Sequence, residues 1–474
     1  MADANLAALE SLFAKHPHIT YVTPSSPDYT SLRKIFARDQ EAIPLAITRP
    51  KSAADVSLLV KFAVSNAIKF TIRTGGHNLS GAAFAQDALA IDMRDISYVN
   101  VSRDKKTAKI GGGILQFDLA TALDEEGLVT PTGAVGSVGY VGWSTYGGYG
   151  PLSRQWGLGV DQIVGARLVN SEGDVIIADE RLLKGLRGGG GLFGVIVELE
   201  IKVYPLKNAS SSLFIRRNGQ VLTGTLILDS QDLNSTFKKF NAGYLELASS
   251  GMPKELVVQQ LIVNSPNGKA MCVAFMWSSE DLEAGQAWLK KIEALATVVM
   301  NTVAVSTVPG YLQGNAALVP ESVHGEGYTH NFRKITNEVA DVIADSLVKM
   351  TEDPGCMFVV HELKGASATP NASSVFGTRD EHFMLEILGY ALDIKNRETA
   401  IAWANDTWAA LGKTESDNLL PGTYISLDRP VLKPGTAPLS RLYGSNCRDV
   451  LALKKEYDAK DVFSYAVPQL KNYI

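Results

Sequence analysis

Three clusters of glycine constrain this chain more than any other feature of its sequence. They lie around residues 75, 140 and 190, at three separate predicted turns of one α/β region. A glycine has no Cβ and adopts positive φ angles readily, so the backbone at such turns can approach another group closely. The chain has 42 glycines, and their clustering indicates that the backbone faces a ligand.

The first cluster lies between two predicted strands. Apolar runs at 68–72 and 88–91 flank the segment Arg73-Thr74-Gly75-Gly76-His77-Asn78. Successive N–H groups in such a turn can form a cradle for an anion, and Arg73 adds a positive charge beside it. His77 then lies at the mouth of a loop suited to a diphosphate. The alternative is a tight hairpin turn with a hydrogen-bonding histidine, and local composition supports both about equally.

The second cluster, residues 136–150, has six glycines in fifteen residues, interleaved with aromatic side chains. Flexible linkers are polar, so this composition favours a packed backbone that faces a flat ligand. No cluster shows the strand–GxGxxG–helix pattern of a Rossmann site, and none contains the Gly-Lys-Ser/Thr of a P-loop.

The rest of the pattern predicts an α/β region followed by a second α+β region, with an antiparallel sheet covered by helices on one face. Helices are expected at 3–15, 28–38, 53–66, 116–126, 233–248, 281–296, in the 340s, at 397–411 and at 443–458. Strands are expected at 45–48, 68–73, 88–91, 96–101, 107–110, 162–169, 174–178, 195–203, 210–228, 255–276, 356–363 and 382–390.

Composition restricts the partners. The net charge of −5 argues against nucleic acid and anionic membranes. Neither a signal peptide nor an apolar run of about 18 residues is visible, so we expect a cytoplasmic protein. The cysteines Cys272, Cys356 and Cys447 are few, odd in number and widely spaced, which predicts buried free thiols.

The histidines do not predict a metal site. His324 and His330 flank a short glycine-containing segment and could form a pair of ligands. Scattered histidines rarely bind a metal, so none is expected. His16 and His18 lie in a polar N-terminal segment and are expected at the surface.

The ordered motifs resemble those of a known family. The segment 73–78 resembles the flavin loop of FAD-linked oxidases with a PCMH-type FAD-binding domain, in the vanillyl-alcohol-oxidase superfamily. Berberine-bridge-enzyme-like and 6-hydroxy-D-nicotine oxidase-like proteins belong there. The resemblance continues through the sequence segments 111–113, 147–150, 156–161, 186–195, 443–446 and 455–463.

This resemblance implies a fold and a division of the chain. The fold is α+β: a PCMH-type FAD-binding domain of two α/β subdomains at 1–205, and an antiparallel-sheet substrate domain at 206–420. Residues 421–474 return to the FAD-binding domain.

The resemblance also implies FAD, attached covalently through His77 to the 8α-methyl group of the flavin. Many relatives add a second link through a cysteine, but Val135 stands at that position, so a single link is expected. Noncovalent FAD is the alternative. Val138, with Tyr140 close by, falls where a side chain controls access of O2, and a valine there is typical of oxidases. The FAD-binding residues carried over are Arg73, Thr74, Gly75, Gly76, His77, Asn78, Ser80, Gly81, Val138, Gly139, Gly142, Trp143, Tyr146, Gly147, Gly148, Gly150, Val195, Ile196, Tyr443 and Asn446.

The implied activity is oxidation of a small alcohol or amine, a secondary metabolite, with hydride passing to the flavin and O2 reduced to H2O2. A base must take the proton from the substrate O–H or N–H. The candidates are Tyr424, whose pKa a nearby cation would lower, then Glu386 and His361, with Tyr390 a further one. A flavin-dependent cyclase or pericyclase is the alternative, and an FAD-binding protein without turnover is a third. The expected partners are a small-molecule substrate and O2.

Overall fold

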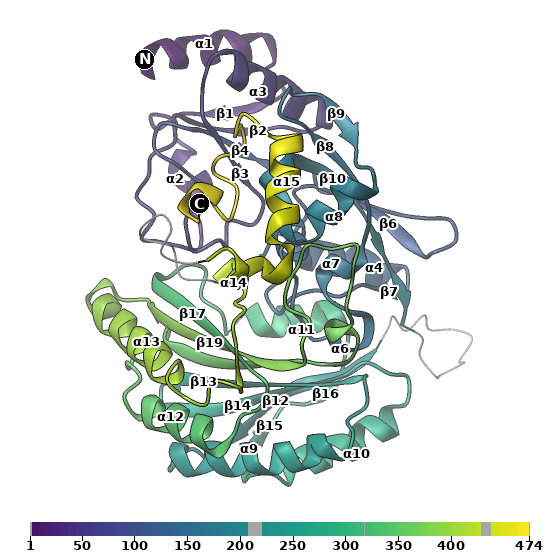
Figure 1. Cartoon of the computed structure of the whole chain (residues 1–474), viewed down its shortest axis with the longest axis vertical. Helices are drawn as coiled ribbons and strands as arrows, with labels where there is room; N and C mark the ends of the chain where they lie inside the picture. The colour runs from purple at the N-terminus through teal and green to yellow at the C-terminus, as the bar shows by residue number, and fades with distance from the viewer. Residues whose placement is uncertain (1, 207–219, 317, 428–437, 474) are drawn as a thin grey trace.

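The computed structural model describes residues 2–206, 220–316, 318–427 and 438–473. Figure 1 shows two layered regions, one above the other, with the N-terminal half of the chain in the upper region. The lower region is one large sheet with helices along its outer face. The mixed helix-and-sheet class expected from the sequence is confirmed.

The first sheet carries the glycine loop, which leaves the end of β3. Its strands are ordered β1-β2-β4-β3, and β3 pairs with β4 in parallel, with Phe70 opposite Leu89. Parallel neighbours cannot be joined by a tight hairpin. The hairpin interpretation of the loop is therefore wrong. The strands are β1 (Thr20–Val22), β2 (Ala46–Arg49), β3 (Phe70–Arg73) and β4 (Leu89–Asp92).

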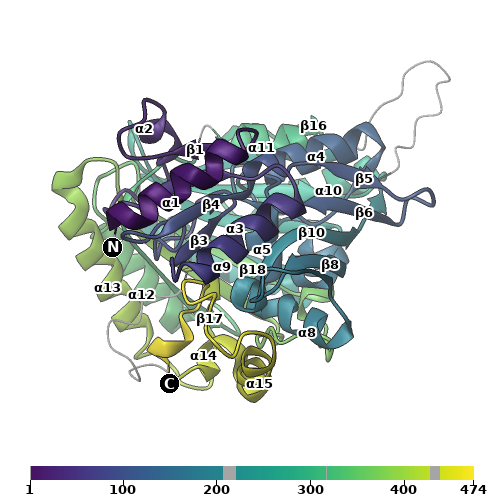
Figure 2. The ribbon, with the colours of Figure 1, turned by 90° about the horizontal axis from the view of Figure 1, so that it is seen from above.

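Two helices cover this sheet on its outer side. Figure 2, seen from above, shows α1 (Ala2–Lys15) and α3 (Ala53–Ser65) lying over β3 and β4. Ser52 caps α3, because its hydroxyl accepts the N–H of Asp55 at 3.2 Å. Val56, Leu59 and Val60 of α3 are fully buried against the apolar residues of the strands.

The second sheet is antiparallel and has the order β5-β6-β10-β8-β9. A short pair, β7 (Leu128–Val129) and β11 (Tyr204–Pro205), lies beside it. The five strands are β5 (Val99–Val101), β6 (Thr107–Gly111), β8 (Ile163–Val169), β9 (Val175–Ile177) and β10 (Val195–Lys202). The helices of this part are α2 (Tyr29–Leu32), α4 (Gln116–Glu125), α5 (Tyr140–Thr145), α6 (Ser153–Trp156), α7 (Gly159–Gln162) and α8 (Glu180–Gly189).

The large sheet is antiparallel, with the order β15-β12-β14-β13-β18-β19-β17-β20 and β16 paired to β12. Its strands are β12 (Val221–Leu228), β13 (Leu256–Ser265), β14 (Gly268–Trp277), β15 (Val298–Asn301), β16 (Ala304–Ser306), β17 (His324–Phe332), β18 (Met357–Leu363), β19 (His382–Ala391) and β20 (Leu419–Leu420). Its helices are α9 (Leu233–Ser249), α10 (Leu282–Glu293), α11 (Val308–Ala316), α12 (Asn337–Val348) and α13 (Arg397–Leu411).

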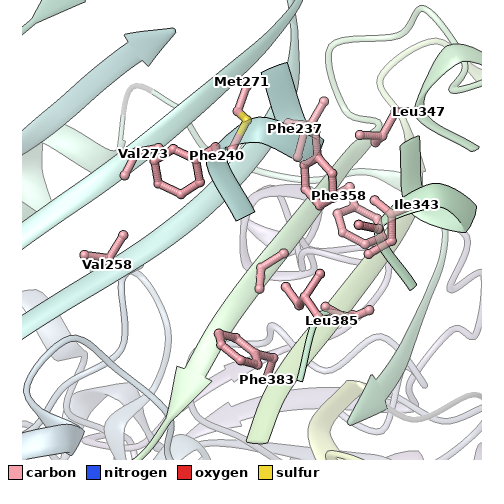
Figure 3. Close-up of a cluster of buried hydrophobic side chains, with 14 of the residues drawn as sticks. Phe237, Phe240, Val258, Met271, Val273, Ile343, Leu347, Phe358, Phe383 and Leu385 are labelled. Carbon is pink, nitrogen blue, oxygen red and sulfur yellow. The ribbon is translucent and has the colours of Figure 1, made fainter. Parts of the chain in front are cut away.

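Alternation along the strands gives this sheet two different faces. Val258 and Ile262 of β13 pack toward the outer helices, in the apolar core drawn in Figure 3. Gln259 and Leu261 alternate with them and point to the opposite face. Figure 1 shows α9, α10, α12 and α13 along the outer side only. The inner face is therefore free to form the wall of a site.

The C-terminal segment packs on the upper region. It contains α14 (Ser440–Tyr443) and α15 (Cys447–Tyr457), and Lys184 of α8 pairs with Asp449 of α15 at 2.6 Å. The rings of Phe70 and Phe463 meet edge to face, with centroids 6.0 Å apart. The domain boundaries at 205 and 420 stay a prediction.

Some expected elements differ from those observed. The helix expected at 28–38 is only the short α2, because the N–H of Arg38 donates to Val323 O at 2.8 Å instead of continuing a helix. The strand expected at 96–101 begins at Val99. Residues 210–219 of the strand expected at 210–228 lie outside the described part. The sequence did not predict β15, β16, α11 or β17. β17 has the sequence HGEGYTHNF, and its two glycines weaken the local strand signal.

Within the described ranges, none of the helices is both long enough and apolar enough to cross a membrane. All three cysteines are free thiols; Cys356 is buried, whereas Cys272 and Cys447 are only half-buried, against the expectation that all would be buried.

Candidate active site

A cavity of about 890 Å³ lies between the glycine loops of the upper region and the inner face of the large sheet. Residues from the segments 70–79, 133–149 and 191–196 form one side of it. Inward-facing residues of β12, β13, β14, β18 and β19 form the other. The cavity is therefore walled by parts of the chain that are distant in sequence.

Two glycine clusters touch at the cavity wall. A Cβ on Gly75 would lie 2.3 Å from the backbone N of Gly139, and a Cβ on Gly139 would lie 2.4 Å from Cγ2 of Thr74. Neither position has room for a side chain. The two loops can pack backbone to backbone only because both residues are glycine.

His77 follows this contact and faces the cavity. Its ring stacks on Phe36, with centroids 4.9 Å apart and planes inclined at 23°. Its Nε2 lies 3.0 Å from Oγ of Ser137. Burial, together with the positive charge of Arg73, lowers the pKa of His77 to about 4. At neutral pH the imidazole is uncharged and keeps a nitrogen lone pair.

Arg73 lines the same cavity, but its charge is engaged by the protein. Its guanidinium donates to the backbone oxygens of Leu32 and Lys34 and lies 3.7 Å from the buried carboxylate of Asp92. Burial lowers its pKa to about 10. Its Nε has no hydrogen-bond partner among the described residues. The fixed charge expected beside the loop is thus present, although most of its donors point away from a ligand.

The cavity fits a flat group such as the flavin of FAD. A Cβ on Gly142 would meet no atom within 4 Å, so nothing in the packing of the chain requires a glycine there. Gly142 nevertheless lines the cavity, on α5. The hydroxyl of Tyr149, which also lines it, is buried without a partner among the described residues. A group that fills this space accounts for both observations.

Three polar side chains form a row on the inner face of the large sheet, on neighbouring strands. His361 of β18 lies diagonally across from Glu386 of β19, with Nε2 and Oε1 3.1 Å apart. Nε2 of Gln259 on β13 lies 3.4 Å from Nε2 of His361. All three line the cavity. We call them the polar row.

Tyr424 also lines the cavity, and its ring meets that of Tyr149 edge to face with centroids 4.6 Å apart. Burial is the largest influence on its hydroxyl and raises the pKa to about 12, and the nearby Glu386 acts in the same direction. The expected lowering of this pKa by a cation is therefore wrong. At neutral pH this hydroxyl is protonated.

The structure brings most of the predicted site residues to the cavity. Those that line it are Arg73, Thr74, Gly75, Gly76, His77, Asn78, Val138, Gly139, Gly142, Trp143, Tyr146, Val195, Ile196, His361, Glu386 and Tyr424. Val135 lines it too. Their roles stay predictions.

The remaining predicted residues do not line the cavity; they are Ser80, Gly81, Gly147, Gly148, Gly150, Tyr443 and Asn446. Packing explains several of them. A Cβ on Gly150 would lie 1.7 Å from the backbone oxygen of Thr132. The Asn446 amide donates to the backbone oxygen of Val375 at 3.2 Å. Tyr443 is buried in the core of the upper region.

Sequence reasoning missed Gln259, Phe36 and Tyr149. A signal for Gln259 was available: two glutamines interrupt the apolar strand Leu256–Ser265. Gln260 bonds with Asn241 at 2.9 Å on the helix side, which leaves Gln259 for the other face. No comparable local signal marks Phe36.

The two histidines considered as a metal pair have separate partners. His324 lies 2.7 Å from a carboxylate oxygen of Asp39. His330 stacks on Trp408, and its Nε2 lies 2.9 Å from the backbone oxygen of that residue. Throughout the described ranges, no three His, Cys, Asp or Glu side chains are grouped to hold a metal ion.

A family model and a protein of known sequence family match this chain. Residues 44–179 match a family described as an FAD binding domain. The FAD-linked oxidoreductase aurO of Gibberella zeae is 32% identical over 463 residues, which cover 97% of this chain and 87% of that protein.

Solved structures share the fold. The crystal structure of 6-hydroxy-D-nicotine oxidase from Arthrobacter nicotinovorans has a TM-score of 0.81 at 22% identity and covers 94% of this chain and 96% of its own. Glucooligosaccharide oxidase from Acremonium strictum, whose description names a 6-S-cysteinyl, 8α-N1-histidyl FAD, has a TM-score of 0.79 at 20% identity, with 97% of both chains covered. The resemblance seen in the sequence motifs is confirmed.

Proposed function

This chain belongs to the FAD-linked oxidoreductases, and on that premise we propose that it is an oxidase for a small alcohol or amine of secondary metabolism. Bound FAD would supply the hydride-accepting chemistry, with O2 as the final acceptor and H2O2 as the product. The observation that carries the proposal is the neutral His77 in a cavity whose glycine walls leave room for a flat cofactor.

His77 is the residue we propose to hold FAD covalently. Its low pKa keeps a nitrogen lone pair free at neutral pH. That lone pair would form the bond to the 8α carbon in place of a C–H bond; the methyl proton and the imidazole proton would leave to solvent, and the two electrons released would pass to O2. Stacking on Phe36 and the contact with Ser137 fix the ring plane. Val135 stands at the position where many relatives carry a second link through a cysteine. A valine side chain is not a nucleophile, so we propose a single attachment.

Glu386 is the residue we propose to accept the substrate proton. It is a carboxylate in the cavity wall, and His361 at 3.1 Å fixes its direction. Tyr424 has a pKa near 12, so it holds its own proton and serves as a hydrogen-bond donor to the substrate oxygen or nitrogen. This assignment moves the role of base from Tyr424 to Glu386.

The test uses the purified protein. A yellow preparation whose flavin precipitates with the protein in acid supports the covalent attachment, and flavin left in the acid supernatant contradicts it. Peroxide released from a panel of alcohols and amines supports the oxidase. A colourless protein that cannot be loaded with FAD would overturn the proposal.

One arm of this test separates the oxidase from a cyclase. An oxidase needs one O2 for each product molecule, so product stops after a single turnover without air. Continued anaerobic product formation with flavin that stays oxidised would identify the cyclase instead.

A further inference from the structure

The inner wall of the large sheet contains few charges. Of the described residues that line the cavity, only Arg73 and Glu386 carry a formal charge at neutral pH, apart from histidine. Arg73 already pairs with Asp92 and donates to two backbone oxygens. A carboxylate or phosphate on the substrate would find no free cation there, and burying an unpaired anion is costly.

Three further polar groups of the wall are engaged within the protein. The hydroxyl of Thr223 donates to Phe275 O at 2.8 Å, and that of Thr302 donates to Thr225 O at 3.1 Å. The amide of Asn315 donates to the backbone oxygen of Ala134 at 3.0 Å. Each sugar ring carries several hydroxyls, and each one that loses water needs a new partner. The three groups above are already bonded and are not available to an oligosaccharide.

Between these groups the wall is apolar. Its strands present aliphatic side chains and an aromatic ring around the polar row, namely Ile227, Leu261, Val263, Met357, Val359, Leu388 and Tyr390. The apolar lining continues to the solvent, because Val305 and Leu318 line the cavity and are 48% and 59% exposed. An extended apolar body can therefore lie along the wall and reach the opening.

We propose that the substrate is an apolar molecule with one hydroxyl or amine, which binds with that group on the polar row and the rest of the molecule on the apolar wall. This inference rests on the proposed function, since it names the substrate class of the same cavity. Glu386 is the anchor, because it is the one carboxylate among the described lining residues. Its hydrogen bond to an O–H or N–H donor is charge-assisted.

The experiment measures binding by calorimetry to the flavin-containing protein. The probes are 2-naphthol, 2-methoxynaphthalene, cellobiose and mandelate. We expect 2-naphthol to bind about tenfold more tightly than 2-methoxynaphthalene, because only 2-naphthol can donate a hydrogen bond to the charged carboxylate of Glu386. Cellobiose and mandelate should bind at least about tenfold more weakly than 2-naphthol.

Two matched variants locate the effect. Glu386→Gln should reduce the preference for 2-naphthol over 2-methoxynaphthalene by about fivefold, because it removes the charge of the acceptor. Glu381→Gln makes the same change at an exposed residue just before β19 and should leave the preference unchanged. If both variants lose the preference for 2-naphthol equally, Glu386 is not the anchor of the substrate.

A second readout separates this inference from the proposed function. Anaerobic flavin reduction is followed with 2-naphthalenemethanol, 2-naphthylmethylamine and cellobiose, and the first two distinguish an alcohol from an amine. Tight binding of cellobiose or mandelate overturns the substrate class, even if the enzyme proves to be an oxidase. The remaining outcome is that 2-naphthol binds more tightly than 2-methoxynaphthalene, but no probe and no member of the wider alcohol and amine panel reduces the flavin. This outcome supports the substrate class and contradicts the proposed oxidase function.

Discussion

Nε2 of His77 lies 3.0 Å from Oγ of Ser137, although the two residues are 60 positions apart in the chain. The contact joins the loop after β3 to the second glycine cluster. It exists because Gly75 and Gly139, beside these residues, let the two backbones meet. The proposed point of attachment for FAD is thus set by a contact between two loops.

Replacing His77 tests the attachment directly. His77→Ala should leave no flavin with the acid-precipitated protein, because the only proposed nucleophile is gone. Ser137→Ala removes the neighbouring hydroxyl and should keep covalent flavin. In-gel fluorescence after denaturation measures both. Covalent flavin in His77→Ala would contradict the assignment.

Gly142→Ala tests whether the cavity is shaped for a cofactor. A Cβ there meets no protein atom within 4 Å, so the variant should fold with unchanged thermal stability when free of flavin. Flavin loading should fall about tenfold, because overpacking a fitted site costs roughly 1–3 kcal/mol. Gly412→Ala is the control, since its Cβ meets nothing closer than 3.5 Å and lies outside the cavity lining. Equal loading of the two variants would argue against FAD at this position.

The ion pair of Asp161 with Arg379 should be important for stability. The guanidinium makes two hydrogen bonds of 2.8 Å to the carboxylate, and the side chains are only 17% and 10% exposed. Asp161 also accepts the N–H of Leu158 at 2.9 Å. Arg379→Ala should lower the free energy of unfolding by about 3–5 kcal/mol, because it leaves a poorly solvated carboxylate unpaired.

The exposed pair of Arg333 with Asp380 provides the comparison. Its side chains are 49% and 55% exposed. Arg333→Ala should change the free energy of unfolding by less than about 1 kcal/mol, because water screens such pairs. Urea titrations measure the free energy of unfolding of both variants. If Arg379→Ala and Arg333→Ala lower it by similar amounts, the stabilising role given to the Asp161 pair is contradicted.

His330 should make the protein sensitive to acid. Burial against Trp408 lowers its pKa to about 4, below the value of roughly 6.5 in an unfolded chain. Below about pH 6.5 the unfolded state binds a proton that the folded state does not, so stability falls as the pH drops toward 4. Between pH 7 and pH 5 this residue alone should lower the free energy of unfolding by about 1–2 kcal/mol.

His330→Gln removes the titrating group and isolates its share of the acid sensitivity. The loss of unfolding free energy between pH 7 and pH 5, measured with urea at each pH, should be smaller in this variant by that amount. Identical pH dependence in variant and wild type would show that His330 titrates normally.

Local sequence patterns predicted much of the fold. The alternation of apolar residues in β13 and β19 and the helical spacing of α9, α10, α12 and α13 follow from burial of one face of each element. Elements with weak local signals were missed. β17 contains Gly325 and Gly327, and its strand conformation depends on pairing with β19.

The sequence by itself determined where the backbone can approach another group closely, at the glycine clusters, and where a nucleophile is available, at His77, because both depend on residue type alone. Only the tertiary structure decided that Gln259, His361 and Glu386 form one row, since strand pairing brings together residues about 25 to 130 positions apart. Only the tertiary structure decided that the pKa of Tyr424 is raised rather than lowered, because this pKa depends on burial and on neighbours that the local sequence does not contain.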